Sequence, residues 1–247
     1  MSDLKRYYEL HEQEYVRRFS AGHCGWDAGP YDEFFMRPFV RESLERYALD
    51  ACGARALDLG CGAGALSCML AEEGFDVVGV DISPSAIEVA KKMAADRELP
   101  ICFEVDDVLS GDFRPSDQFD LIIDGHLLHC IVLHEERQRL LKRVREWLTK
   151  DGEFWIETMC LRYTTPVNPD LKLDSRGVVW APVGEDHGCC DAVARDGGWW
   201  IPQRMIARSP KFLIEELSAA GLSLIDNEWY EPIEHGAPGG FRARCRI

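Results

Sequence analysis

The chain has 247 residues, a length that suits a single α/β domain with a well-packed core. Its composition, 46% hydrophobic and 29% charged, is typical of a globular protein and excludes a disordered or fibrous chain. The formal net charge of -15 disfavours nucleic acid and anionic membrane surfaces as partners, because like charges repel. No run of eighteen apolar residues is present, and the N-terminal residues lack the apolar core of a signal peptide. We therefore expect a cytoplasmic protein without a membrane span.

Residues 1–50 predict two helices separated by a glycine-rich loop. Apolar residues recur at helical spacing from Tyr7 to Phe19, and again from Phe34 to Tyr47. The intervening segment, Ala21–Pro30, is rich in glycine and ends in proline, which is typical of a loop. We interpret residues 1–50 as a helical cap.

The following residues alternate short apolar runs with amphipathic stretches. Strands are predicted over residues 55–59, 76–81, 101–105, 119–124 and 154–156. Helices are predicted over residues 63–73, from Ser83 onward, and over 135–148. Ser83 followed by Pro84 is typical of a helix start, because a serine oxygen can accept from the first amides and proline has no amide to leave unpaired. Strands and helices in alternation predict a parallel sheet covered on both faces.

Residues 159–203 interrupt this alternation with several prolines and glycines and with the pair Trp199-Trp200. We interpret them as an insertion that serves as a lid. A helix is then predicted to start at Ser209-Pro210, followed by strands over 222–229 and 241–247 that form an antiparallel hairpin. The expected organisation is one domain, 1–247, with a core formed by 51–158 and 204–247.

A glycine-rich turn follows the first predicted strand. Asp58 precedes Gly60, Gly62 and Gly64, which have the spacing G-x-G-x-G. A strand, a glycine turn and a helix form a nucleotide site at the carboxyl edge of a parallel sheet. Dinucleotide-binding proteins use G-x-G-x-x-G and place a pyrophosphate at the helix N-terminus. The closer spacing favours S-adenosylmethionine, which has no phosphate and carries an ammonium group that an acid can hold.

A second acid, Asp81, ends the second predicted strand, where a carboxylate can accept hydrogen bonds from both ribose hydroxyls. The next residue, Ile82, can lie against an adenine ring. Dehydrogenases also place an acid at this position. Asp81 therefore indicates a nucleoside, and the glycine spacing distinguishes between the cofactors.

Together these segments resemble the class I, Rossmann-like family of S-adenosylmethionine-dependent methyltransferases. Asp58–Gly64 looks like the family's first motif, Val80–Ser83 is similar to its ribose-binding segment, and Phe119–Asp124 resembles its fourth-strand motif. Leu148–Phe154 is similar to its proline- and glycine-rich turn. Thr149–Gly152 departs from the usual residues of that turn, but we expect a turn there.

The resemblance implies a three-layer Rossmann-like fold with a mostly parallel seven-stranded sheet that ends in an antiparallel hairpin. It also implies that Asp107, rather than Asp106, reads the adenine amino group together with Val108. The expected cofactor-binding residues are Asp58, Gly60, Cys61, Gly62, Gly64, Asp81, Ile82, Asp107, Val108 and Asp124.

Two histidines follow the fourth strand, where the transferred methyl group should face the acceptor. His126 or His129 can remove a proton from an acceptor, since an imidazole titrates near neutral pH. Alternatively, both only shape the pocket wall. A sulfonium already activates its methyl group, so positioning and exclusion of water can suffice without a base.

Further cysteines and tryptophans offer alternatives for the acceptor. Cys24, Cys189 and Cys190 could form a thiolate site for a thiol or metalloid acceptor, with histidines His23 and His187 nearby in sequence. Their spacing matches no metal motif, so we expect no bound metal, and the alternative is that they are ordinary loop thiols.

Trp26 is assigned to the acceptor pocket together with His126. Trp199 and Trp200 either stack on a ring, cage a cationic amine or pack a lid against the body.

The expected reaction is methyl transfer to a nitrogen or oxygen atom of a small molecule, which leaves S-adenosylhomocysteine. Three alternatives stay open: a thiol or metalloid methyltransferase, an NAD-type oxidoreductase, and a non-catalytic nucleoside-binding module. Neither the acceptor nor the oligomeric state follows from the sequence.

Overall fold

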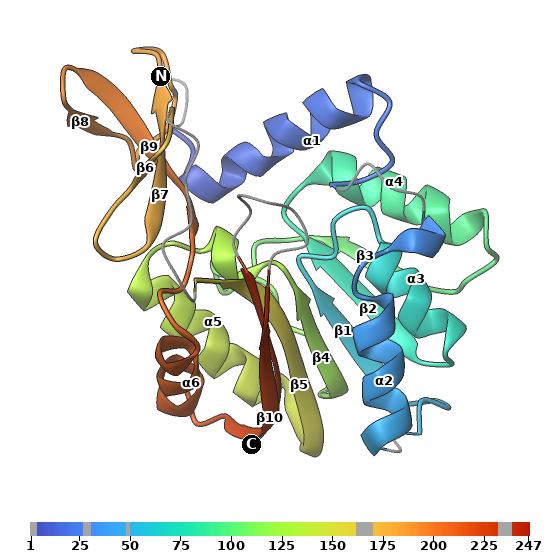
Figure 1. Ribbon diagram of the computed structural model, residues 1–247. Helices are drawn as coiled ribbons and strands as arrows, with labels where there is room; N and C mark the ends of the chain where they lie inside the picture. Colours follow the sequence, from blue (N-terminus) through green and yellow to red (C-terminus); the bar gives the residue numbers. More distant parts are fainter. Residues whose placement is uncertain (1–3, 27–30, 48–49, 162–169, 232–238) are drawn as a thin grey trace. The chain divides into compact units, whose positions relative to one another are not determined.

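The computed structural model describes residues 4–26, 31–47, 50–161, 170–231 and 239–247 (Figure 1). Its contacts divide the chain into two compact units. We call residues 11–125 and 146–155, with Ile247, the α/β unit, and residues 1–10, 126–145 and 156–246 the β-rich unit.

A seven-stranded sheet, whose strands come from both units, has the order β10-β11-β5-β4-β1-β2-β3. The strands are β1 (Arg55–Leu59), β2 (Asp76–Asp81), β3 (Cys102–Val105), β4 (Phe119–Gly125), β5 (Leu148–Cys160), β10 (Ser223–Tyr230) and β11 (Gly239–Arg246). Parallel pairs join β1 to β2 and to β4, and β2 to β3, whereas β10 and β11 are antiparallel. The predicted sheet is confirmed.

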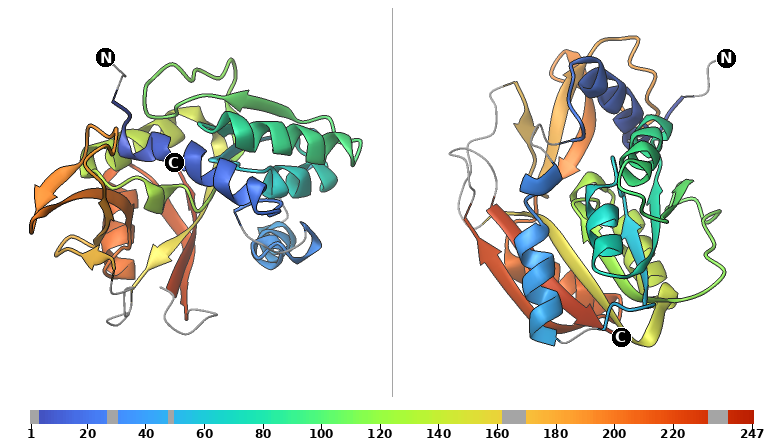
Figure 2. Two further views of the ribbon diagram at one scale, coloured as in Figure 1. Left: turned by 90° about the horizontal axis from the view of Figure 1, so that it is seen from above. Right: turned by 90° about the vertical axis from the view of Figure 1, so that its right-hand side faces the viewer.

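In the α/β unit, helices α3 (Ala65–Glu72) and α4 (Pro84–Ala95) pack side by side against β1, β2 and β3 (Figures 1 and 2). Helix α4 starts as predicted, since the Ser83 hydroxyl oxygen accepts from the Ala86 amide at 3.1 Å. Helix α1 (His11–Ser20) packs against α4, and α2 (Arg37–Tyr47) contributes Phe39 to the core around Trp155. The two helices predicted for residues 1–50 are therefore present.

In the β-rich unit, residues predicted as an irregular insertion form a second sheet, with antiparallel pairs and the order β6-β7-β9-β8 (Figure 2). Its strands are β6 (Lys172–Leu173), β7 (Val178–Val183), β8 (Val193–Arg195) and β9 (Gly198–Met205). The short helices η1 (Tyr7–Leu10) and η3 (Leu128–Cys130) contact β9. Residues 162–169 of the insertion lie outside the described residues.

The remaining helices are α5 (His134–Trp147), α6 (Pro210–Ala219) and the short η2 (Tyr31–Glu33). The turn expected near Gly152 is wrong, because β5 begins at Leu148 directly after α5. A Cβ on Gly152 would lie 2.9 Å from the Phe119 carbonyl oxygen, so this glycine allows close approach to β4. Among the described residues, no helix has the length and apolar character needed to cross a bilayer.

Candidate cofactor site and the carboxyl end of strand β4

The glycine loop after β1 has the backbone conformation that its sequence requires. Gly60, Gly62 and Gly64 have φ angles of 65°, 52° and 83°, a region that residues with side chains rarely adopt. A Cβ on Gly64 would lie 2.8 Å from the Cβ of Ala90, and one on Gly62 would lie 2.5 Å from the Tyr15 hydroxyl. The loop therefore requires residues without side chains where its backbone packs between β1 and the neighbouring helices.

Asp81, the last residue of β2, organises this loop. One carboxylate oxygen accepts from the Gly62 amide at 2.9 Å, and the other accepts from the Ser83 amide at 2.8 Å. A carboxylate has about four lone-pair positions, so both oxygens can still accept from ribose hydroxyls. Burial raises the pKa of Asp81, and its amide hydrogen bonds oppose this shift. Cys61 is buried, and Ile82 is half-buried.

Three carboxylates lie near the ends of the neighbouring strands β4, β1 and β2. Asp58 on β1 is buried and accepts from the Ser67 hydroxyl at 2.6 Å. Asp124 on β4 is also buried, and it is paired across the sheet with Leu59, the residue after Asp58. Burial raises the pKa of Asp58 to about 7, and the charges of Asp81 and Asp124 add to the shift. A cationic group would relieve this repulsion, so the site fits the ammonium end of S-adenosylmethionine.

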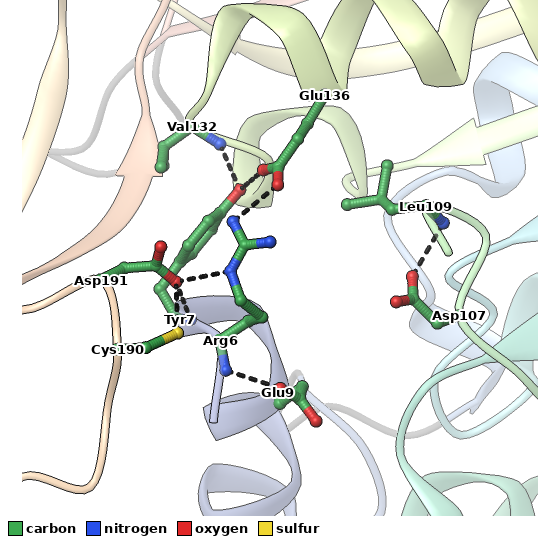
Figure 3. A network of polar contacts seen from close by, with 9 residues as sticks. All are labelled: Arg6, Tyr7, Glu9, Asp107, Leu109, Val132, Glu136, Cys190 and Asp191. Carbon is green, nitrogen blue, oxygen red and sulfur yellow. Dashed lines mark hydrogen bonds and ion pairs between the residues drawn. The ribbon is translucent and has the colours of Figure 1, made fainter. Parts of the chain in front are cut away.

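Asp107 follows β3, at the same edge of the sheet. One of its carboxylate oxygens accepts from the Leu109 amide at 2.8 Å (Figure 3). Asp107 is half-buried and the adjacent Val108 is buried. A carboxylate beside an apolar side chain suits an adenine amino group and ring, and this role of Asp107 and Val108 stays a prediction.

Helix α1 brings two residues to this region that the sequence reasoning missed. Glu12 accepts from the Ser83 hydroxyl at 2.5 Å and from the Ser85 hydroxyl at 2.6 Å, which ties α1 to the first turn of α4. Tyr15 is buried with its hydroxyl beside Gly62. A glutamate and a tyrosine on the same face of the predicted helix were the only signal in the sequence.

A second polar group is built around His126, the residue directly after β4. Its φ of 85° is left-handed, and its amide donates to the Glu157 carbonyl oxygen at 3.1 Å. The ring atom Nε2 lies 3.2 Å from a Glu157 carboxylate oxygen, and about a third of the His126 side chain is exposed. His129, also a candidate, is buried, with its ring centroid 5.0 Å from that of His126.

Glu157, on β5, is completely buried and holds this group together. Arg242 on β11 donates Nε–H to one of its oxygens at 2.5 Å, and the Tyr230 hydroxyl on β10 donates to the other. Burial alone would raise the pKa of Glu157, but His126, Arg242 and Tyr230 outweigh it and hold the pKa below its ordinary value. The signal available in the sequence was a charged residue directly after the apolar segment Phe154–Ile156, since a buried charge requires partners.

A family model for a methyltransferase domain matches residues 51–197, more than half of the chain. The chain belongs to the class I, Rossmann-like methyltransferase family. The cofactor of this family is S-adenosylmethionine, as predicted from the glycine spacing.

A methyltransferase of known pathway is among the curated relatives. The ubiquinone biosynthesis O-methyltransferase of Coxiella burnetii (strain RSA 493 / Nine Mile phase I) is 35% identical over 152 residues, 60% of this chain and 62% of that protein. The chain spans between about half and about three-fifths of the length of the curated relatives it matches.

Solved methyltransferase structures match nearly the whole chain. A S-adenosylmethionine-dependent methyltransferase from Clostridium acetobutylicum ATCC 824 has a TM-score of 0.64 at 16% identity, covering 97% of this chain and 98% of that one. The Burkholderia thailandensis 1,6-didemethyltoxoflavin-N1-methyltransferase, solved with 1,6-didemethyltoxoflavin and S-adenosylhomocysteine, has a TM-score of 0.63 at 18% identity, covering 97% and 88%. At these identities the likeness shows the methyltransferase fold.

The thiolate alternative for a methyltransferase acceptor gains no support from the described residues. Cys189 is buried and Cys190 exposed, and burial together with the charge of Asp191 raises the pKa of both thiols, so each keeps its proton near neutral pH. No group of three or more His, Cys, Asp or Glu side chains in the described part of the chain is arranged to hold a metal ion.

The tryptophans considered for the acceptor pocket have partners of their own. The Arg18 guanidinium lies 4.5 Å from the ring centroid of Trp26, which remains 42% exposed. In the second sheet, Trp199 contacts the His187 ring at 5.0 Å, and Lys172 Nζ lies 4.0 Å above Trp200. Each ring thus packs against a cationic or aromatic side chain, and the assignment of Trp26 to the acceptor pocket stays a prediction.

Proposed function

We propose that this chain transfers the methyl group of S-adenosylmethionine to an oxygen or nitrogen atom of a small molecule and releases S-adenosylhomocysteine. The observation that carries this proposal is the set of three carboxylates at adjacent strand ends beside a loop whose three glycines all have positive φ angles. The curated O-methyltransferase relative supports an oxygen acceptor, and the N-methyltransferase of similar fold supports a nitrogen acceptor.

The residues of the α/β unit would divide the binding of the cofactor among them. Asp58 would hold the ammonium group, with Asp124 adding negative charge, and Asp81 would accept from the ribose hydroxyls next to Ile82. Asp107 and Val108 would bind the adenine. Gly60, Cys61, Gly62 and Gly64 would offer backbone rather than side chains to the adenosyl group.

The cofactor, when bound, supplies a methyl group that its sulfonium has already activated. Tyr15 and Glu12 of α1 would then cover the loop, because their contacts with Gly62 and the first turn of α4 place the helix across this part of the unit. A covered site excludes water, which protects the reactive methyl group and strengthens the electrostatic contacts of the buried acids.

Calorimetry with S-adenosylhomocysteine tests the proposed binding residues. Asp81→Asn should weaken binding about tenfold to a hundredfold, since it removes a charged acceptor of two ribose hydrogen bonds. Asp96→Asn is the matched control, because Asp96 is an exposed aspartate at the end of α4 and should leave the affinity unchanged. Native protein that binds NAD and not S-adenosylhomocysteine would instead establish an oxidoreductase.

Methyl transfer itself is measured with radiolabelled S-adenosylmethionine against a panel of phenols, alcohols, amines, carboxylic acids and thiols. Transfer to a phenol, alcohol, carboxylic acid or amine supports the proposal, whereas transfer to thiols alone contradicts it. Tight cofactor binding with no transfer to any compound would favour a non-catalytic binding module. Replacing Cys189 and Cys190 with serine should leave the rate nearly unchanged, and complete loss would restore the thiolate alternative.

A further inference from the structure

We propose that the negative charge of the α/β unit makes it hold S-adenosylmethionine in preference to S-adenosylhomocysteine, so that the product is released more readily than the cofactor. This inference rests on the proposed function, because it concerns the same binding residues. The two compounds share an ammonium and a carboxylate group. They differ in charge at sulfur, which is a sulfonium in S-adenosylmethionine and an uncharged thioether in S-adenosylhomocysteine.

The net charge of the chain is distributed unevenly between the two units. The α/β unit contains 26 acidic and 11 basic residues, whereas the β-rich unit contains 17 of each. The formal net charge of -15 is therefore carried entirely by the unit that contains the proposed cofactor-binding residues. Such an excess of acids produces a negative potential, which raises the local concentration of cations and favours their binding.

The proposed binding acids of this unit lie among other acids. Asp81 and Asp124 both act electrostatically on Asp58, and Glu12 acts in the same way on Asp81. Burial is the main cause of the raised pKa of Asp58 and of Asp81, and these neighbouring charges raise it further. An added positive charge on a ligand lowers this repulsion, whereas an uncharged sulfur does not.

Salt separates the exposed acids of this unit from the buried ones. Asp58 is 1% exposed and Asp81 is 9% exposed, so dissolved ions screen their interaction with a ligand only weakly. Exposed acids interact through water, where charges separated by more than ~8 Å are largely screened at physiological ionic strength. Added salt should therefore remove the contribution of the exposed acids and leave that of the buried ones.

The strand register places one exposed acid, Glu104, beside the proposed site. On β3 it is paired with Val80, the residue before Asp81, and neighbouring strands lie ~5 Å apart. Asp96 is also exposed, but it follows the far end of α4, ~20 Å along the helix from Ser83. The two acids therefore provide a near and a distant position for the same change of charge.

Methyl transfer moves the positive charge away from sulfur. The carbon–sulfur bond breaks, its electron pair stays on sulfur, and the charge passes with the methyl group to the acceptor, which keeps it or loses a proton to water. The same acids therefore hold the compound that remains less strongly than the one that entered, without any movement of the chain. This favours release of the product, a step that limits the rate of many enzymes.

Calorimetry at increasing salt concentration tests the preference without an acceptor. The native protein is titrated with each compound, and the affinity for S-adenosylmethionine is divided by that for S-adenosylhomocysteine. We expect this ratio to fall about threefold to tenfold between about 20 and about 500 mM sodium chloride, because only the sulfonium charge is screened. Binding of both compounds at a ratio independent of salt would overturn this inference alone. Binding of neither compound would contradict the proposed function.

Charge reversal at the near and the distant acid tests the cause of the preference. Glu104→Lys should lower the affinity ratio about twofold to threefold at about 150 mM salt, since it places a positive charge beside the site. Asp96→Lys, the matched control, should leave the ratio nearly unchanged, because its charge lies beyond the screening length. Glu104→Gln should shift the ratio in the same direction by less. An unchanged ratio in Glu104→Lys, or equal shifts in the two lysine variants, would contradict the inference.

A stable analogue separates the effect of the charge from that of the methyl group. In this compound a carbon that bears an amino group replaces the methylated sulfur, so the positive charge is present and the methyl group is absent. We expect the analogue to dissociate more slowly than S-adenosylhomocysteine in stopped-flow measurements at low salt, and the difference to narrow as salt is added. If its dissociation depends on salt no more than that of S-adenosylhomocysteine, the preference does not come from charge and the inference is wrong.

Discussion

Two buried glutamates of the β-rich unit, Glu157 and Glu136, are held by the same kinds of residue. Glu136 accepts from Arg6 at 2.7 Å and from the Tyr7 hydroxyl at 2.9 Å (Figure 3). Glu157 likewise accepts from an arginine and a tyrosine. Each carboxylate thus has a charged and a neutral donor, which is what burial of an acid requires.

The two groups differ in what lies beyond these donors. At Glu136 the network ends in fixed partners: the Tyr7 hydroxyl accepts from the Val132 amide, and Arg6 also donates to Asp191, both at 2.9 Å. At Glu157 a further partner is a titratable ring on strained backbone with a third of its side chain exposed. Similar residues therefore fasten chain segments in one place and hold a partly exposed imidazole in the other.

A third buried glutamate, Glu216, forms the ion pair whose loss should cost the most stability. Glu216 accepts two hydrogen bonds from Arg137, at 2.7 and 2.6 Å, and both side chains are almost completely buried. Arg137→Met should lower the free energy of unfolding by about 3–5 kcal/mol, because it leaves a buried charge without its partner. The double variant with Glu216→Leu should recover most of that loss in urea titrations. Arg137 also donates to the carbonyl oxygens of Leu128 and Ile131, at 2.5 and 3.1 Å, and no recovery would mean that it stabilises the fold through these contacts instead.

Glu136→Gln should cost about 2 kcal/mol in the same urea titrations, less than the first variant because Arg6 is partly exposed. Methyl transfer at saturating substrate should be unchanged, since the Arg6, Tyr7 and Asp191 side chains of this network are not among the proposed cofactor-binding residues. A rate that falls in parallel with stability would remove the distinction between the two glutamates.

Cofactor binding should weaken as the pH falls, because Asp58 then takes up a proton. Asp58 has a pKa of about 7, so it is largely protonated at pH 6 and a cationic ligand must displace that proton. We expect the affinity for S-adenosylhomocysteine to be about tenfold lower at pH 6 than at pH 8. Proton release, measured by calorimetry in buffers of different ionisation enthalpy, checks the cause. Asp58→Asn should abolish the dependence.

The shifted pKa values of Asp58 and Glu157 make the stability of the fold depend on pH in opposite directions. The raised pKa of Asp58 means that the unfolded chain ionises first, so this residue favours the folded state most below its ordinary value of 3.8, and that contribution is lost as the pH rises to about 7. The lowered pKa of Glu157 favours the folded state above its ordinary value of 4.5, and that contribution is lost as the pH falls through the folded pKa.

The smallest expected effect concerns the strain at His126. His126→Gly and His126→Ala both lack the imidazole, but only alanine keeps the penalty of a positive φ. The glycine variant should be more stable than the alanine variant by about 1 kcal/mol in thermal unfolding. Equal stabilities would show that the backbone at this position relaxes and that no strain is stored.

The α/β unit was predicted well from the sequence because its signals are local. The bounds of β1 and β2 agree to the residue, since buried runs end there at a glycine turn and at Asp81. Serine and proline mark the start of α4, and the spacing of the glycines identified the cofactor class. Each of these features depends on neighbours a few residues away.

The β-rich unit was predicted less well for the same reason. Strands β7 and β9 contain Pro182 and Pro202 and lack a clear alternation, so the second sheet was not expected. His126 was identified as a candidate, but its partner Glu157 and the two residues that donate to Glu157, Tyr230 and Arg242, come from three strands. Only pairing of β10, β11 and β5 in one sheet brings those residues together.

The place of β11 in the sheet has a consequence for how the protein folds. This strand lies between β10 and β5, and its Arg242 meets a partner 85 residues earlier in the chain. Contacts across such separations form slowly, because a long loop must close before any hydrogen bond rewards it. During refolding, compaction around Trp155 should therefore precede the insertion of β11, and enzymatic competence should return later than tryptophan burial.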